Sequence, residues 1–80
     1  MTRVTVLYFA SLRDVAGVAS EVVDSGAGDL RALYETLRAK HGFGLPVDRL
    51  RVAIDGAFAS WDDGLRSGSE VAFIPPVSGG

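Results

Sequence analysis

The one clear helical pattern in this sequence spans residues 30–41, and it limits the folds available to the chain. Its apolar residues recur at the i, i+3, i+4, i+7 spacing of one helix face: Leu30, Leu33, Tyr34 and Leu37. Asp29 is placed to cap the amino end, and Gly42 is placed to end the helix. Because one helix can cover only one face of a sheet, the pattern predicts an α+β domain with the other face uncovered.

The other segments of the chain favour extended structure. β-Branched and aromatic residues predict strands over 3–9, 20–25 and 70–74, and Asp55-Gly56 predicts a hairpin between two short extended runs of 51–60. Residues 10–17 predict a turn or two of helix that Ser11 could cap and Gly17 could end. We therefore expect one domain over residues 1–80, with a mixed four- to five-stranded sheet and one main helix on one side.

Strand alternation predicts what lies on the uncovered face. If Val4, Val6 and Tyr8 face the helix, then the neighbouring positions of the strands face outward. These outward apolar residues are Leu7, Phe9, Phe58 and Ile74. An uncovered apolar group in so small a domain indicates a partner surface. The alternatives are that a loop covers it, or that a register shift of one residue inverts the two faces.

Composition excludes several classes of protein. The chain has no cysteine and a single histidine, His41, so a thiol nucleophile, a cysteine-ligated metal site or a Ser-His-Asp triad is not expected. His41 sits where the helix should end, and the helix dipole favours a histidine there. A net charge of −2 argues against nucleic-acid binding. Without a long apolar run or a signal peptide, we expect a cytoplasmic protein that binds no membrane.

The carboxyl end, "FIPPVSGG", makes the sharpest functional prediction. Pro75 and Pro76 end the last strand, and residues 77–80 add roughly 13–14 Å of reach if extended. Glycine has no side chain, so Gly79 and Gly80 can thread a narrow tunnel in another protein. Such a tail delivers a carboxylate, which an ATP-dependent partner can convert to an acyl adenylate. If sulfur then attacks, a thiocarboxylate forms, and in a chain without cysteine the sulfur must be carried on Gly80.

These residues resemble a known family. "YFASLRDVAG" (8–17), the Asp55-Gly56 hairpin and "GSEVAFIPPVSGG" (68–80) are similar to the MoaD branch of the MoaD/ThiS sulfur carriers, the small subunits of molybdopterin synthase. The resemblance covers the whole chain and implies the β-grasp fold of ubiquitin. It differs at the hairpin, where relatives often carry asparagine in place of Asp55.

The resemblance implies a role for the tail. An E1-like adenylating enzyme uses ATP to adenylate Gly80, and a sulfur donor such as a cysteine desulfurase or rhodanese converts it to a thiocarboxylate. The tail then enters the large subunit of molybdopterin synthase and gives sulfur to a cyclic pterin monophosphate, which becomes a dithiolene. The complex is a heterotetramer, and the chain itself binds no cofactor or metal. The tail residues that insert would be Pro75, Pro76, Val77, Ser78 and Gly79, and the interface residues Leu7, Phe9, Phe58 and Ile74.

The residues leave three alternatives open. A carrier for thiamin thiazole or cysteine biosynthesis would share the diglycine. A ubiquitin-like modifier would join the same carboxylate to a lysine. A plain interaction domain would carry the diglycine without using it.

Overall fold

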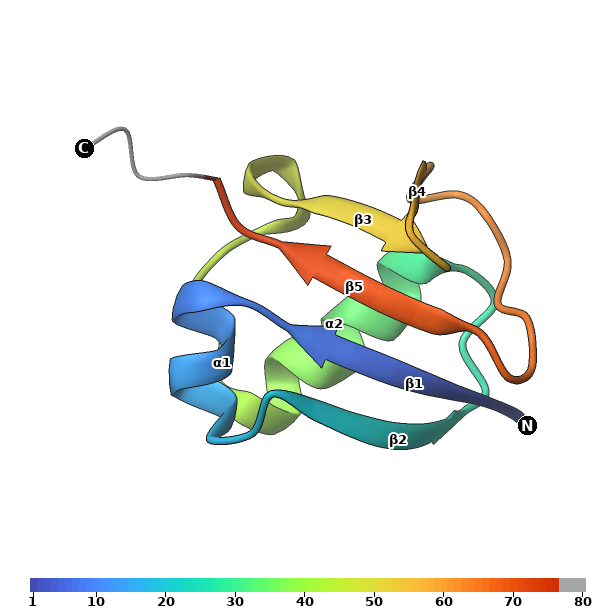
Figure 1. Ribbon diagram of the computed structural model, residues 1–80, viewed down its shortest axis with the longest axis horizontal. Coiled ribbons are helices and arrows are strands. Elements are labelled where there is room, and N and C mark those ends of the chain that lie inside the picture. Colours follow the sequence, from blue (N-terminus) through green and yellow to red (C-terminus); the bar gives the residue numbers. More distant parts are fainter. Residues whose placement is uncertain (77–80) are drawn as a thin grey trace.

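Five strands form one mixed sheet in the computed structural model, which describes residues 1–76 (Figure 1). The strand order is β2-β1-β5-β3-β4; β1 and β5 run parallel, and the other neighbours are antiparallel. The strands are β1 (Thr2–Tyr8), β2 (Ser20–Ser25), β3 (Arg51–Ile54), β4 (Ala57–Ala59) and β5 (Glu70–Ile74). The helices are α1 (Ala10–Ala16), α2 (Leu30–His41) and the short 3₁₀ helix η1 (Val47–Arg49).

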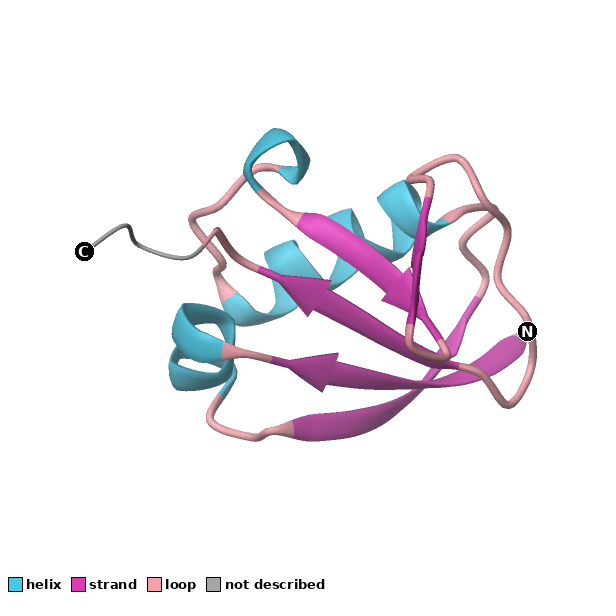
Figure 2. Ribbon diagram, turned by 45° about the horizontal axis from the view of Figure 1, so that its top comes forward, coloured by secondary structure: helices cyan, strands magenta, loops and turns pink. Residues whose placement is uncertain are grey.

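The hydrophobic core lies between α2 and one face of the sheet (Figure 2). The four apolar residues predicted for the helix face are all buried. So are six inward residues of the sheet: Val4, Val6, Tyr8, Val52, Val71 and Phe73. The Tyr34 ring of α2 packs edge-on against Phe73 of β5, with the ring centroids 5.1 Å apart. Burying each such side chain contributes about 1.5–3 kcal/mol, so this face supplies most of the apolar stabilisation of the fold. Among residues 1–76, no helix is long and apolar enough to span a membrane.

Local signals read from the sequence are confirmed at both ends of α2 and in the hairpin. Asp29 caps the helix, its Oδ1 accepting from the Ala32 amide at 2.8 Å, and Gly42 closes it with φ of 79°. Asp55 and Gly56 have φ of 49° and 86°, the positive pair that a type I′ turn requires. The Asp55 carboxylate also accepts from the Glu70 amide at 2.9 Å, which ties the hairpin to the start of β5.

The segment after β1 differs from the prediction in two ways. The strand ends at Tyr8 rather than Phe9, and Phe9 occupies the N-cap position of α1 with an extended backbone. Ser11 lies inside α1, so its proposed capping role is wrong. The Phe9 carbonyl instead accepts from the Leu12 amide at 3.1 Å, and no side chain caps this helix. The chain turns into α1 through Ala10, whose φ of 50° is in the left-handed region.

Candidate functional site

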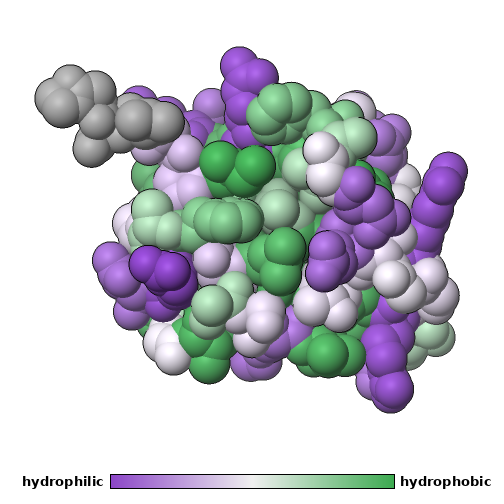
Figure 3. All heavy atoms as spheres, viewed as in Figure 1, coloured by the Kyte–Doolittle hydropathy of each residue, from purple (hydrophilic) through white to green (hydrophobic). Residues whose placement is uncertain are grey.

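The face of the sheet opposite α2 carries a row of apolar side chains across four strands. Leu7 lies opposite Ala72, Ala72 opposite Ala53, and Ala53 opposite Phe58. We call the surface formed by this row, together with Phe9 and Ile74, the open face. Figure 3 shows hydrophobic residues across the middle of this face, with hydrophilic residues around them. The predicted assignment of the faces is therefore confirmed, and the strand register is not inverted.

The open face is exposed to different degrees along its length. Phe58 is 69% exposed and Phe9 is 45% exposed, whereas Leu7 and Ile74 are half-buried. A shallow depression of about 260 Å³ lies between these four side chains. Large apolar side chains that stay this accessible in a small domain mark a surface for association. No loop among the described residues covers them, which removes the first alternative to a partner surface.

The open face continues into the base of the carboxyl-terminal segment. Ile74 ends β5, Pro75 is buried, and Pro76 is exposed. The buried ring of Pro75 is thus still packed on the domain. The remaining predicted tail residues, Val77, Ser78, Gly79 and Gly80, lie outside the described residues, so their predicted roles remain predictions.

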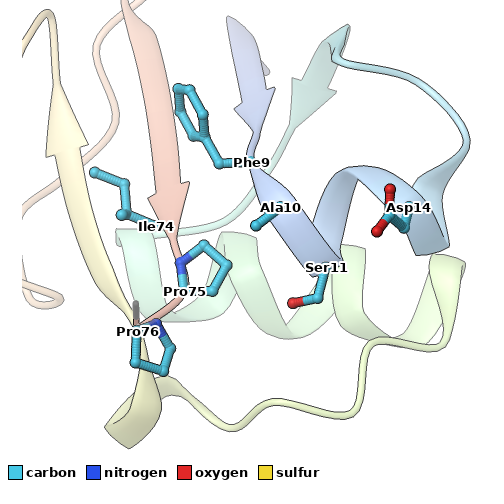
Figure 4. Close-up of a pocket in the computed structure, with 7 residues that line it drawn as sticks. All are labelled: Phe9, Ala10, Ser11, Asp14, Ile74, Pro75 and Pro76. Carbon is cyan, nitrogen blue, oxygen red and sulfur yellow. The ribbon is translucent and has the colours of Figure 1, made fainter. Parts of the chain in front are cut away.

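Two grooves flank this base and share Ile74, Pro75 and Pro76. The α1 groove, of about 610 Å³, adds Phe9, Ala10, Ser11 and Asp14. Figure 4 shows Ala10 and Ser11 across the groove from the two prolines, with Asp14 further along α1. The β3 groove, of about 450 Å³, adds Asp48, Arg49, Leu50, Arg51 and Phe58. The base of the tail therefore lies between an acidic side chain on α1 and two cations near β3.

The strongest electrostatic cluster lies at the other face, at the end of α2. The Glu21 carboxylate of β2 accepts from the Tyr8 hydroxyl at 2.5 Å, from His41 Nε2 at 2.7 Å and from Lys40 Nζ at 3.1 Å. Partial burial raises the pKa of Glu21, but these hydrogen bonds outweigh it and lower the pKa to about 2. Burial, helped by the same carboxylate, raises the pKa of the Tyr8 hydroxyl well above its usual range. The cluster joins α2 to β1 and β2.

The single histidine of the chain, His41, has a structural role in this cluster. His41 is placed at the helix end as predicted, but its partner is a carboxylate on a neighbouring strand, and its side chain is only 13% exposed. Among residues 1–76, no group of His, Asp or Glu side chains is arranged to hold a metal ion. The described part of the open face offers a shallow apolar depression with charged residues at its edge.

Three features of the site were not predicted from the sequence. The first is the position of Arg51 on the open face, directly opposite Ile74. Strand alternation is the signal that could have placed it there. The second is the groove that Asp14 lines together with the two prolines. It depends on how α1 packs against the end of the sheet, which local sequence patterns do not encode. The left-handed backbone of Ala10 has no sequence signal, since alanine is not a residue that favours positive φ.

A mixed five-stranded sheet with one long helix across a single face is the β-grasp fold of ubiquitin-like proteins. The chain belongs to the ThiS family, whose model matches residues 6–80. It is 32% identical to the molybdopterin synthase sulfur carrier subunit of Escherichia coli, over 96% of this chain and 99% of that relative. It is 31% identical to the human protein of the same description, over 100% of this chain and 97% of the relative.

Solved structures give the same fold. A putative molybdopterin converting factor subunit 1 from Pyrococcus furiosus is 32% identical, with a TM-score of 0.79 over 96% of this chain and 100% of its own. The small archaeal modifier protein 1 of Haloferax volcanii is 26% identical, with a TM-score of 0.80 over 96% of this chain and 100% of its own. A complex of subunits 1 and 2 of molybdopterin-converting factor from Helicobacter pylori contains a chain with a TM-score of 0.68 at 22% identity, covering 99% of this chain and 100% of its own.

Proposed function

We propose that this chain is the sulfur-carrier subunit of a molybdopterin synthase. The observation that carries the proposal is the continuity of the open face with the segment that ends in Gly79-Gly80. Ile74 belongs to both, and Pro75 packs on the domain directly after it. The names of the curated relatives, which are similar over nearly the whole chain, support the same function.

The reactive group in this proposal is the main-chain carboxylate of Gly80. It attacks the α-phosphorus of ATP in an E1-like adenylating enzyme, and pyrophosphate leaves. A persulfide from a donor such as a cysteine desulfurase or rhodanese then displaces AMP, and reductive cleavage of the sulfur–sulfur bond by a thiol leaves a thiocarboxylate on Gly80. That sulfur attacks a cyclic pterin monophosphate, and two such transfers complete the dithiolene. Hydrolysis of the acyl intermediate returns the carboxylate.

The catalytic side chains in this scheme belong to the partners, so the chain is a carrier rather than an enzyme on its own. The large subunit would bind the open face through Leu7, Phe9, Phe58 and Ile74 and receive residues 75–80 in its active site, within a heterotetramer that acts in the cytoplasm. Aromatic side chains, phenylalanine included, are enriched at protein interfaces relative to the rest of the surface. The Helicobacter pylori protein, whose structure is a complex with a second subunit, is a precedent for a complex of two different subunits.

Intact-mass spectrometry tests the chemistry. The full chain is incubated with ATP, a sulfur donor and the adenylating enzyme of its own organism. We expect a species in which one oxygen is replaced by sulfur, and we expect none from a chain lacking Gly80. Because this deletion removes no side chain, the melting temperature should stay nearly unchanged. Absence of the sulfur species in the wild type would contradict the proposal, and a large loss of stability on deletion would mean that Gly80 has a structural role.

A protein modifier is the second candidate, because a small archaeal modifier protein shares the fold at a TM-score of 0.80 and 26% identity. A modifier uses the same adenylate but transfers it to a lysine amine, which forms an isopeptide bond. Incubation with ATP and a lysate of the source organism separates the two. Conjugates that retain Gly80 linked to lysine would favour the modifier, and a free thiocarboxylate would favour the carrier. Carriers for thiazole or cysteine synthesis would be distinguished by the large subunit that they bind.

A further inference from the structure

An arginine stands directly in the apolar surface of the open face. Arg51 of β3 lies opposite Ile74 of β5, so both side chains emerge on the same side of the sheet. The guanidinium carbon of Arg51 lies 5.5 Å from the centroid of the Phe58 ring, within the range of a cation–π contact. The cation thus lies beside Ile74, the last strand residue before the tail.

Among residues 1–76, no acidic side chain forms an ion pair with Arg51. The ion pairs in this part of the chain involve other cations, and Arg49 does not take part in one either. Asp48 also lines the β3 groove, but two arginines against one aspartate leave the groove positive. A chain with a net charge of −2 thus places a locally positive site at the base of its tail.

A partner that covers the open face must supply a hydrogen-bond acceptor to this guanidinium. Removing a guanidinium from water without supplying an acceptor costs more than the surrounding apolar contacts return. A carboxylate is the suitable acceptor, because its two oxygens match the parallel N–H groups of arginine. Arginine is also enriched at the centres of interfaces, where such pairs are formed.

We propose that Arg51, supported by Arg49, binds an aspartate or glutamate on the large subunit and so sets the direction from which the tail enters. This inference rests on the proposed function. The α1 groove on the other side of the tail carries Asp14, which would repel the same carboxylate. The opposite charges of the two grooves therefore allow one orientation of the partner and disfavour its reverse.

Binding of the full chain to the large subunit of the same organism tests this inference. Dissociation constants are measured by calorimetry at low and high salt for the wild type, Arg51→Glu and Arg51→Gln. Arg66→Glu is the matched control, since Arg66 is exposed, forms no ion pair among the described residues and lies before β5, at the opposite end of that strand from the tail. Circular dichroism verifies that each variant is folded; if Arg51→Glu is not, Arg51→Gln carries the test.

We expect Arg51→Glu to weaken binding about 10- to 100-fold at low salt, with a smaller loss for Arg51→Gln and a difference that shrinks at high salt. Arg66→Glu should stay within about twofold of the wild type, as a distant surface charge would. If folded Arg51→Glu binds the large subunit as tightly as Arg66→Glu does, the inference is overturned and the carrier function is left standing. The same holds for folded Arg51→Gln where that variant carries the test. No binding by the wild type would overturn both the inference and the carrier function. If changing one acidic residue of the large subunit to arginine restores the binding of Arg51→Glu, that acidic residue is the partner of Arg51.

Discussion

The two faces of the sheet use adjacent residues of the same strands for different purposes. Phe73 of β5 is completely buried against α2, whereas its neighbour Ile74 is half-buried and lies beside Phe58, which is 69% exposed. Both faces are apolar, and only one has a helix to cover it. The difference separates two properties that are usually mixed in a small domain: the inner face carries the stability, and the open face is free to bind. Substitutions one residue apart should therefore affect different measurements.

Phe73→Ala should produce the largest loss of stability. The ring packs between Tyr34 and Trp61, with centroid distances of 5.1 and 5.9 Å, so its removal leaves a cavity that the sheet and helix cannot close. We expect the free energy of unfolding to fall by about 3–5 kcal/mol, measured by urea denaturation. This is a large share of the roughly 5–15 kcal/mol available to a small domain. A loss below about 1 kcal/mol would show that the inner face is not the main source of stability.

Ile74→Asp should weaken binding to the large subunit and leave the stability of the domain nearly unchanged. A carboxylate on the open face at the base of the tail must be desolvated when a partner binds, so affinity for the large subunit should fall by about 2 kcal/mol or more. The free energy of unfolding should change by less than about 1 kcal/mol, because the side chain is already partly in water. Binding is measured by calorimetry, and Phe9→Ala should act in the same direction.

Val22→Asp is the matched control for this prediction. Val22 belongs to the edge strand β2, where it is 64% exposed and lies opposite Thr5 of β1. It is on the same face of the sheet as Ile74 but away from the tail. It should leave affinity for the large subunit nearly unchanged. If Ile74→Asp and Val22→Asp weaken binding equally, or if neither does, then the part of the open face beside the tail is not the partner surface.

Much of the division between the two faces could be predicted from alternation alone. Val4, Val6 and Tyr8 were assigned to the inner face and Leu7, Phe58 and Ile74 to the open face, and the structure confirms each of them. This worked because the strands have a strict period of two and only one long helix competes for them. Local chemistry likewise predicted the Asp29 cap and the Asp55-Gly56 turn.

The remaining features depend on contacts between distant segments. The Glu21 cluster brings together residues that are 13 to 20 positions apart, and no local pattern shows that a β2 carboxylate will reach the end of α2. The entry into α1 was mispredicted because Ser11 is a good capping residue, but the geometry leaving β1 placed Phe9 at the N-cap instead. Tertiary context decided both cases.

Glu21→Gln should lower stability in a pH-dependent way, and this tests how α2 is held to the inner face. The pKa of Glu21 is about 2 in the folded chain and below its usual value, so the ionised carboxylate stabilises the fold above about pH 4.5 and loses this effect as the pH falls toward 2. We expect a loss of about 1–2 kcal/mol at pH 7 that shrinks toward pH 2, measured by urea denaturation across this range. The groups facing Glu21 are Tyr8, Lys40 and His41.

A second variant separates this effect from general acid denaturation. Asp14→Asn removes one exposed carboxylate that forms no ion pair among residues 1–76, so its stability should follow the wild type at each pH. A constant difference between Glu21→Gln and the wild type from pH 7 to pH 2 would mean that the cluster contributes through packing and not through its charge.

Ala10→Gly should have the smallest effect, and it tests whether the turn between β1 and α1 is strained. The φ of 50° at Ala10 costs an alanine about 1–2 kcal/mol, which glycine does not pay. Glycine loses about 0.5–1 kcal/mol through the greater freedom of the unfolded chain, so the net result should be a gain of about 0.5–1 kcal/mol. Ala39→Gly, at an exposed position of α2, should instead cost about 0.5–1 kcal/mol in the same urea experiment, because that backbone is helical. Opposite signs for the two alanine-to-glycine changes would locate the strain at the rim of the α1 groove, whereas equal losses would show that Ala10 adopts its conformation without strain.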